Sequence, residues 1–171
     1  SMIENTCASP VNHNPIDFGI DVVIHSATKY MGGHSDICAG AVASSKANME
    51  RIFQLAINLG GSLSDYTVWL LERSIKTMGI RVKCQNENAM RLAVYLHGNE
   101  NIKQVNYPGL TSHPDHALAK AQMHGFGGML SFELKDSIDA TKFRKELKLI
   151  KSSMSLAGVE STVLSPTQTS H

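Results

Sequence analysis

The hydrophobic positions near the start of the chain predict two buried strands. The apolar stretches 21–25 and 37–43 are continuous rather than alternating. Continuous apolar strands are typical of a sheet that is covered on both faces. The pattern therefore predicts a sheet inside a layered fold. Gly40, within the second stretch, predicts the close approach of a neighbouring backbone.

The pattern then changes to helical spacing. Apolar residues three and four positions apart predict helices over 49–57, 68–78 and 82–96. Ser62 and Asp65 have the spacing of a capping box, which predicts the start of the second helix there. Gly79 interrupts the apolar stripe and predicts a bend, which is a candidate crossover between two domains. The apolar faces of all three helices are expected to belong to the core.

Strands and helices alternate in the last third of the chain. The pattern predicts strands over 101–107, 129–134 and 150–155, and helices over 117–123 and 142–149. An alternation of strand and helix along the chain is typical of an α/β fold.

Composition and charge exclude several classes of protein. The chain has 171 residues, of which 42% are hydrophobic, so general disorder is excluded. Lys and Arg number 16 against 15 Asp and Glu, a formal net charge of +1. This balance gives no support for binding to nucleic acid or to an anionic membrane. No apolar run approaches the roughly 18 residues that span a bilayer.

The cysteines and histidines do not indicate a metal site. Cys7, Cys38 and Cys84 are an odd and widely spaced set without a CxxC pair. They predict small buried thiols in a reducing cytosol rather than disulfides or a zinc site. The 8 histidines are scattered, without an HExxH motif, and are expected to be surface or hydrogen-bonded core residues.

The stretch 26–36 is the most informative one for chemistry. Lys29 follows the first predicted strand, beside the hydroxyls of Ser26 and Thr28 and ahead of a Gly-Gly pair. Ligands of open α/β sheets bind at the carboxyl ends of strands. A lysine in a desolvated site there loses its proton and attacks an aldehyde to form a Schiff base. An ordinary solvated lysine at a strand end fits the same residues, so both interpretations stay open.

Several ordered motifs resemble the Cys/Met-metabolism family of pyridoxal-phosphate (PLP) enzymes. The stretch from Ser26 to Asp36 is similar to the family's cofactor-lysine motif. Further similar motifs lie over 5–21, 107–114, 125–132 and 155–161. The resemblance therefore covers essentially the whole chain. The family includes cystathionine γ-synthases, cystathionine γ- and β-lyases and methionine γ-lyases.

The resemblance implies a role for each matching position around the lysine. Lys29 would bind the PLP aldehyde and then move protons on the substrate. Ser26 and Thr28 would bind the cofactor phosphate. Ser155 to Glu160 would lie along the substrate cleft, and Ser161, also placed at the substrate, would orient the lysine amine.

Two positions near the start of the chain bear on the cofactor ring. Thr6 is expected to lie close to the ring. Glu4 stands where the family has an aspartate that pairs with the pyridine nitrogen. Glutamate keeps the charge and adds one methylene, so its carboxylate must approach the pyridine nitrogen from a different position. Ala157 likewise stands in place of a family glycine, and a tighter loop is expected there.

The resemblance also implies an α/β fold in two parts. Residues 1–80 would be the C-terminal part of a PLP-binding large domain with a mainly parallel sheet. Residues 81–171 would be the beginning of a smaller C-terminal α/β domain. A fragment is implied, because the family's phosphate-binding glycine turn, its ring-stacking tyrosine and its carboxylate-binding arginine have no counterparts here. The family also implies a homo-oligomer, a tetramer in its full-length members.

Two hypotheses for function follow. The first is PLP-dependent cleavage or formation of C–S bonds, by β/γ-elimination or γ-replacement, on small sulfur amino acids such as cystathionine. A γ-lyase or γ-synthase activity is favoured, with cystathionine β-lyase or methionine γ-lyase as alternatives. The second is a non-catalytic or oligomer-forming remnant of such an enzyme. A cytoplasmic protein without nucleic-acid or membrane partners is expected. Unpaired sheet edges also predict that the chain alone self-associates.

Overall fold

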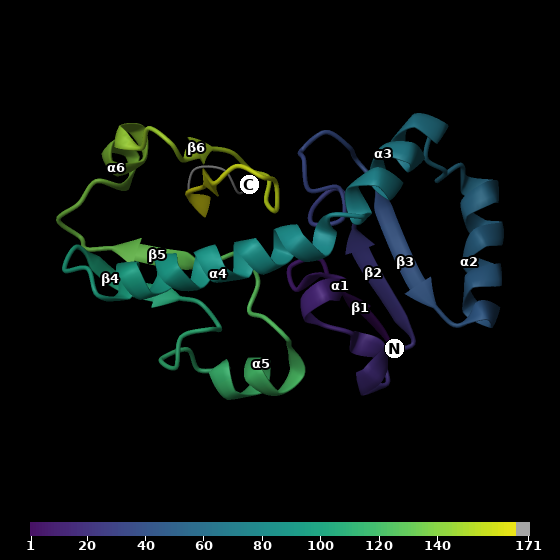
Figure 1. Cartoon of the computed structure of the whole chain (residues 1–171), viewed down its shortest axis with the longest axis horizontal. Helices are drawn as coiled ribbons and strands as arrows, with labels where there is room; N and C mark the ends of the chain where they lie inside the picture. The colour runs from purple at the N-terminus through teal and green to yellow at the C-terminus, as the bar shows by residue number, and fades with distance from the viewer. Residues whose placement is uncertain (167–171) are drawn as a thin grey trace.

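A long central helix joins two groups of strands in the computed structural model of the chain, which describes residues 1–166. This helix, α4 (Met78–His97), runs across the middle of the molecule (Figure 1). A three-stranded sheet lies toward its N-terminal end, and a two-stranded sheet lies along its C-terminal half. The α/β class predicted from the sequence is confirmed.

The three-stranded sheet has the order β1 (Met2–Glu4), β2 (Val22–Ser26), β3 (Gly40–Ser44). β1 and β2 are parallel, with Glu4 opposite Ile24, whereas β2 and β3 are antiparallel. The predicted strand over 21–25 is confirmed as β2. The sheet of this chain is thus mixed, with one parallel and one antiparallel pair.

The second predicted strand is shorter and more exposed than its sequence indicates. It begins at Gly40 rather than at residue 37, and Val42 in its middle is 37% exposed. The prediction that this stretch is buried on both faces is wrong for the described residues. A strand is covered on both faces only where helices or loops pack on each side of it.

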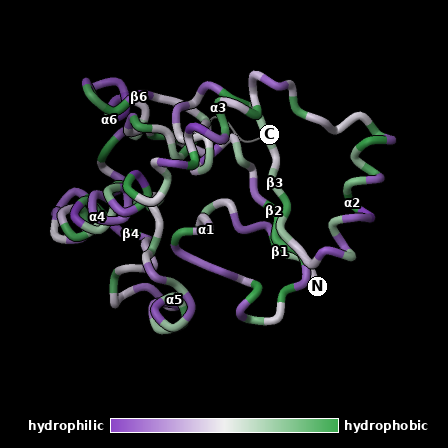
Figure 2. Tube along the Cα trace, turned by 45° about the vertical axis from the view of Figure 1, so that its right-hand side comes forward, coloured by the Kyte–Doolittle hydropathy of each residue, from purple (hydrophilic) through white to green (hydrophobic). Residues whose placement is uncertain are grey.

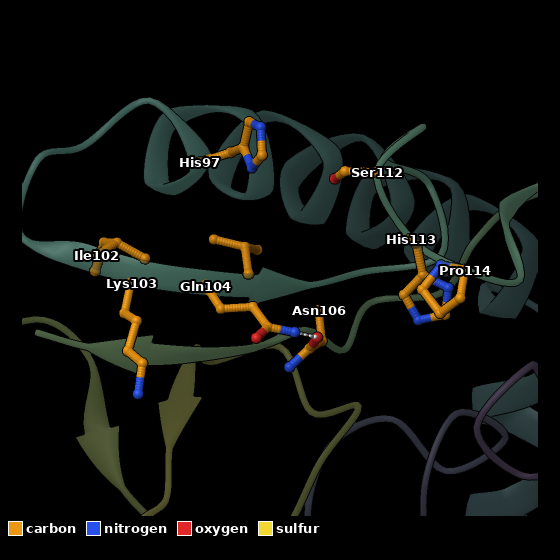
Figure 3. A pocket seen from close by; sticks show the side chains of 9 residues that line it. His97, Ile102, Lys103, Gln104, Asn106, Ser112, His113 and Pro114 are labelled. Atoms are coloured by element: carbon orange, nitrogen blue, oxygen red, sulfur yellow. Dashed lines mark hydrogen bonds between the residues drawn. The ribbon is translucent and has the colours of Figure 1, made fainter.

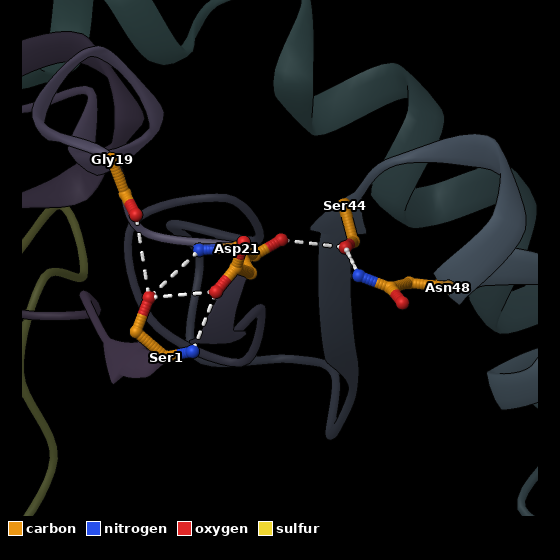
Figure 4. A network of polar contacts seen from close by, with 5 residues as sticks. All are labelled: Ser1, Gly19, Asp21, Ser44 and Asn48. Carbon is orange, nitrogen blue, oxygen red and sulfur yellow. Dashed lines mark hydrogen bonds and ion pairs between the residues drawn. The ribbon is translucent and has the colours of Figure 1, made fainter.

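A polar network holds together the edge of the sheet where β1 and β2 begin (Figure 4). The N-terminal amine of Ser1 lies 2.6 Å from Asp21 Oδ2, and Ser44 Oγ donates to the Asp21 carbonyl at 2.6 Å. Asn48 Nδ2 in turn donates to Ser44 Oγ at 3.0 Å. The pKa of Asp21 is lowered, chiefly by its hydrogen bond with the terminal amine.

Two helices follow the sheet, α2 (Lys46–Leu59) and α3 (Asp65–Ile75). The α2 segment alternates between hydrophobic and hydrophilic residues and stands apart from β4 and its neighbours (Figure 2). Phe53 is 61% exposed and Ile57 is 53% exposed, so the prediction that this helix packs into the core is wrong. Ser64, rather than Ser62, caps α3 by accepting from Thr67 N at 3.3 Å.

The rest of the chain consists of short elements around α4. These are α1 (Ser9–Asn12), the 3-10 helix η1 (Pro15–Phe18), β4 (Ile102–Asn106), α5 (His116–Gln122), β5 (Ser131–Leu134), α6 (Ala140–Glu146), β6 (Lys151–Ser152) and β7 (Thr162–Val163). Each strand and helix predicted for the last third has a counterpart, but β6 is only two residues long, α6 ends at Glu146, and β7 was not predicted. The helices break slightly before the predicted position, because α3 ends at Ile75 and α4 begins at Met78, so Gly79 lies in the first turn of α4.

A cluster of buried apolar side chains lies between α4 and the antiparallel pair β4–β5. Its buried members are Ala89, Ala93, Leu96, Val105, Tyr107 and Leu110. Tyr107 is fully buried, and its hydroxyl donates to the Gly127 carbonyl at 2.9 Å. Burial raises the pKa of Tyr107 to about 12. By contrast, the three cysteines are exposed rather than buried as predicted.

Candidate functional site

The ends of two parallel strands bring the first group of predicted site residues together. β1 ends at Glu4 and β2 ends at Ser26, and parallel strands place these ends at the same edge of the sheet. Thr6 joins them: its hydroxyl accepts from Ser26 N at 2.7 Å and donates to the Glu4 carboxylate. Thr6 N also donates to Glu4 Oε1 at 3.2 Å. Thr6 is buried and Glu4 is exposed.

Lys29 lies in a tight turn directly after β2. The backbone N–H of Lys29 donates to the Ser26 carbonyl at 3.1 Å, and the N–H of Gly33 donates to the Lys29 carbonyl at 2.7 Å. Gly33 has a φ of +68°, in the region that favours glycine. The Lys29 side chain is half-buried, and its Nζ donates to Ser155 Oγ at 3.4 Å.

This contact joins two residues 126 positions apart in the chain. Sequence reasoning expected Ser161 to orient the lysine amine, whereas the structure brings Ser155 to it. Ser161 is exposed, and its carbonyl accepts from Lys151 N at 3.3 Å beside the β6–β7 pair. The two serines are six positions apart in one motif, so the motif alone could not distinguish them.

The Thr28 hydroxyl is engaged with the backbone of Ala39. It accepts from Ala39 N at 2.9 Å and donates to the Ala39 carbonyl at 3.3 Å. A threonine hydroxyl has one hydrogen to donate. Donation to an anion would therefore require Thr28 to give up the longer of these two bonds. Ser26 uses its backbone N–H, rather than its hydroxyl, in the contact with Thr6.

A small pocket lies beside the serine that contacts the lysine. Its volume is about 20 Å³, and Ser155 and Glu160 belong to its lining together with Ser35 of the loop after Lys29. Two of the predicted substrate-binding residues therefore lie in one pocket, next to the lysine loop.

A larger cavity of about 270 Å³ lies elsewhere, between α4, β4 and the turn 112–114 (Figure 3). Its lining includes His97, Gln104 and His113, and none of the predicted site residues. Figure 3 shows Lys103 directed away from α4, and Lys103 Nζ lies 3.5 Å from Glu133 Oε2. This cavity is therefore not the candidate site.

His25, the second-last residue of β2, is buried. Burial lowers the pKa of this imidazole, and the nearby negative charge of Glu4 opposes the shift more weakly. Sequence reasoning did not single out His25. Its position in an apolar strand was the available signal.

Polar residues of α4 also contact the site, and sequence reasoning treated this helix only as packing. The Arg81 guanidinium donates to the Tyr30 carbonyl at 3.0 Å, and Gln85 Nε2 donates to the Gly158 carbonyl at 3.0 Å. The Tyr30 hydroxyl accepts from Gly128 N at 3.0 Å. The spacing of 81 and 85, four residues apart on a helix, could have indicated a shared polar face.

The site combines an amine, a carboxylate and several hydroxyls at one edge of a sheet. Such a set suits a ligand with an aldehyde, a basic ring nitrogen and an anionic group. Residues 1–166 contain no cluster of three or more side chains suited to a metal ion. Within the same residues, no helix is both long and apolar enough to cross a membrane.

Comparison with known proteins gives a family match over the full chain. The family model for "Cys/Met metabolism PLP-dependent enzyme" matches residues 1–171. The cystathionine β-lyase of Lactococcus lactis subsp. cremoris (strain MG1363) is 42% identical over 172 residues, which cover 100% of this chain and 45% of the relative. The chloroplastic cystathionine γ-synthase 1 of Arabidopsis thaliana is 44% identical over 165 residues, which cover 96% of this chain and 29% of that protein.

A solved structure shows the same fold. The crystal structure of cystathionine γ-lyase from Lactobacillus plantarum complexed with L-serine superposes with a TM-score of 0.96 at 38% identity. The match covers 100% of this chain and 45% of that one. The chain thus spans less than half the length of the relatives that it matches.

Proposed function

Because the chain belongs to the Cys/Met-metabolism family of PLP-dependent enzymes, we propose that the protein breaks or forms C–S bonds in cystathionine-like amino acids. The observation that carries the proposal is the half-buried Lys29, whose Nζ lies 3.4 Å from Ser155 Oγ beside the edge where β1 and β2 end. Ligands bind at such edges in α/β sheets.

The residues present fit PLP. Lys29 offers an amine for the aldehyde, and Glu4 offers a carboxylate for the ring nitrogen at the end of the neighbouring strand. Ser26 offers a hydroxyl for the phosphate, and Thr28 offers a second one if its longer bond to Ala39 opens. When bound, PLP supplies an electron sink that stabilises negative charge on the substrate.

Lys29 performs the proton transfers in this proposal. Its amine would hold the cofactor through the aldehyde. When it is free, Nζ would take the proton from the substrate Cα and pass it to the sulfur-bearing group, which leaves as a thiol when the C–S bond breaks. Ser155 orients Nζ for these transfers through the hydrogen bond that joins the two side chains. A base placed in this way contributes about 100- to 10,000-fold to a proton transfer.

Glu4 and Thr6 act together near the ring. The Thr6 hydroxyl and N–H both bind the Glu4 carboxylate, so the position of the negative charge is fixed from the backbone. Such a carboxylate keeps a ring nitrogen protonated, which strengthens the electron sink. The Glu4 side chain folds back onto Thr6, two residues further along the chain.

Glu160 and Ser155 are proposed as substrate-binding residues, because both lie beside the loop that carries Lys29. A γ-lyase or γ-synthase activity is proposed first. A β-lyase activity is the second candidate, because the Lactococcus relative of that name is 42% identical over the whole chain. Association into a homo-oligomer and a cytoplasmic location remain predictions.

Incubation of the protein with PLP and cystathionine tests the proposal. Cleavage at the γ carbon releases 2-oxobutyrate, and cleavage at the β carbon releases pyruvate, so the ketoacid formed identifies the bond broken. Lys29→Ala should lower the rate by at least about 1,000-fold. Lys120→Ala, a matched change on the exposed face of α5, should leave it unchanged. A wild-type protein that releases neither ketoacid from cystathionine would favour the non-catalytic alternative.

A further inference from the structure

Two polar side chains on α4 contact the two loops that carry the Lys29–Ser155 pair. Arg81 and Gln85 are four residues apart, so they lie one above the other on the same face of the helix. Arg81 contacts the loop that follows Lys29, and Gln85 contacts the loop that follows Ser155. A single rigid element therefore holds both partners of the contact.

Arg81 binds carbonyls rather than carboxylates. Its Nη1 donates to the Tyr30 carbonyl at 3.0 Å, and its Nη2 donates to the carbonyls of Met31 at 3.3 Å and Ser74 at 3.0 Å. A guanidinium has five N–H donors in a rigid planar fork, whereas a lysine has one nitrogen. The fork fixes the two residues after Lys29 against the end of α3.

The loop after Lys29 is shaped around this guanidinium. Gly33 lies against it, and a Cβ at Gly33 would overlap Arg81 Nη1. The positive φ of Gly33 also disfavours any other residue there. The absence of a side chain at Gly33 therefore leaves room for the Arg81 guanidinium.

Gln85 holds the serine loop in a comparable way. Its Nε2 donates to the carbonyls of Gly158 at 3.0 Å and of Ala157 at 3.4 Å. Its Oε1 is buried and has no hydrogen-bond partner within residues 1–166. The two acceptor carbonyls belong to the second and third residues after Ser155. The Gln85 amide therefore holds this loop against α4.

We propose that Arg81 and Gln85 are positioning residues that hold the Lys29 amine and the Ser155 hydroxyl at bonding distance. Each acts through loop backbone rather than on the amine itself. The 3.4 Å separation is at the long end of the hydrogen-bond range, so a shift of a few tenths of an ångström breaks the contact. The inference rests on the proposed function, since it takes Lys29 as the residue that reacts with PLP.

A double-mutant cycle between Gln85 and Ser155 tests the inference. The measured quantity is the rate at which the absorption band of lysine-bound PLP develops when the cofactor-free protein is mixed with PLP. Gln85→Met removes both donated bonds at nearly the same volume and should slow this rate about tenfold. Ser155→Ala should slow it similarly. The double variant should be no slower than Ser155→Ala alone, because Gln85 acts through Ser155.

A merely structural role for Gln85 predicts a different result. Its replacement would then slow the reaction by the same factor with and without the Ser155 hydroxyl, and additive effects would overturn the inference. If the wild-type protein forms no such band, the proposed function itself fails. If it forms the band and the effects are additive, only the positioning role is refuted.

Arg81 is tested by exchange for lysine, which keeps the charge and loses the fork. Arg81→Lys should slow band formation about tenfold. Arg91→Lys, the same exchange at an exposed position of the same helix, is the control and should leave the rate unchanged. Equal rates for Arg81→Lys and the wild type would overturn the role of Arg81. If Arg81→Lys does not fold, the Gln85–Ser155 cycle still decides whether α4 positions the pair.

Discussion

At the scale of single residues, Ala157 has a strained backbone conformation beside the site. Its φ is +64°, in the left-handed region where a Cβ meets the following carbonyl. It also lies in the loop that Gln85 binds, two residues after Ser155. The resemblance described above implies a glycine at this position. The sequence predicted only a tighter loop, whereas the structure places a residue with a side chain in a glycine conformation.

Replacement of this alanine by glycine should therefore stabilise the folded state. The relief of strain is about 1–2 kcal/mol, and the greater freedom of glycine in the unfolded chain offsets roughly 0.4–1 kcal/mol of it. A net gain of about 0.5–1 kcal/mol is expected for Ala157→Gly in chemical unfolding. Ala47→Gly, on α2, is the control and should destabilise. A loss of stability for Ala157→Gly would contradict the assigned backbone conformation.

His25 makes stability depend on pH. Its pKa is lowered from 6.5 in the folded protein by burial, so the unfolded chain binds a proton first as the pH falls. The stability that the neutral imidazole contributes is fully present above about pH 6.5 and is lost as the pH falls from there through the lower pKa of the folded state.

Thermal unfolding between about pH 8 and about pH 5 checks this prediction. His25→Gln should reduce the loss of stability across that range. His97→Gln, at an exposed histidine at the end of α4, should leave the loss unchanged. An identical pH dependence in wild type and His25→Gln would show that His25 does not carry the effect.

At the scale of elements, α4 is the part of the fold that the sequence described least completely. Its apolar stripe predicted packing, and Ala89, Ala93 and Leu96 do form the core with β4 and β5. The hydrogen bonds of Arg81 and Gln85 to loops far away in sequence could not be predicted, because periodicity reports which face is buried and not which backbone lies against it.

Other elements show the same limit. β1 is three residues long, too short for a periodic signal, and it is defined by its pairing with β2. Short sequence motifs were enough to propose Lys29, Ser26 and Thr6 as site residues. Lys29 and Ser26 belong to one motif, and Thr6 belongs to a motif that precedes it in the chain. The choice of Ser155 over Ser161 at the lysine amine required the three-dimensional path of the 155–161 loop.

The hydrogen bond between Tyr107 and the turn 125–128 gives a prediction at this scale. Tyr107 is fully buried, and its hydroxyl is bonded to the Gly127 carbonyl. Tyr107→Phe should destabilise the protein by about 1–2 kcal/mol, since the carbonyl loses its partner without a change in packing. Tyr95→Phe, on the exposed side of α4, is the control. Equal free energies of unfolding for wild type and Tyr107→Phe would contradict the prediction.

At the scale of the whole molecule, α2 and α3 expose several large apolar side chains. Leu59 is 83% exposed, Leu55 is 59% exposed and Trp69 is 55% exposed. The sequence predicted these helices as core, and their patterns are amphipathic, but the surfaces that would cover them are not among residues 1–166. A pattern can indicate that a face is to be buried without indicating by what.

The 171-residue chain alone is therefore expected to self-associate. Sedimentation at increasing concentration should show a rising average mass. Leu55→Lys combined with Leu59→Lys should raise the concentration of half-association by at least about tenfold. Leu149→Lys, a change at an exposed leucine outside these helices, should have little effect. A strictly monomeric wild-type chain at all concentrations would refute the prediction.

The central claim is that Lys29 is the residue to which PLP binds, and reductive trapping tests it most directly. The protein is incubated with PLP, treated with borohydride, digested and mapped by mass spectrometry. The account predicts one stable adduct, on the peptide that contains Lys29, and its loss in Lys29→Ala. An adduct confined to other lysines, or none at all, would contradict it.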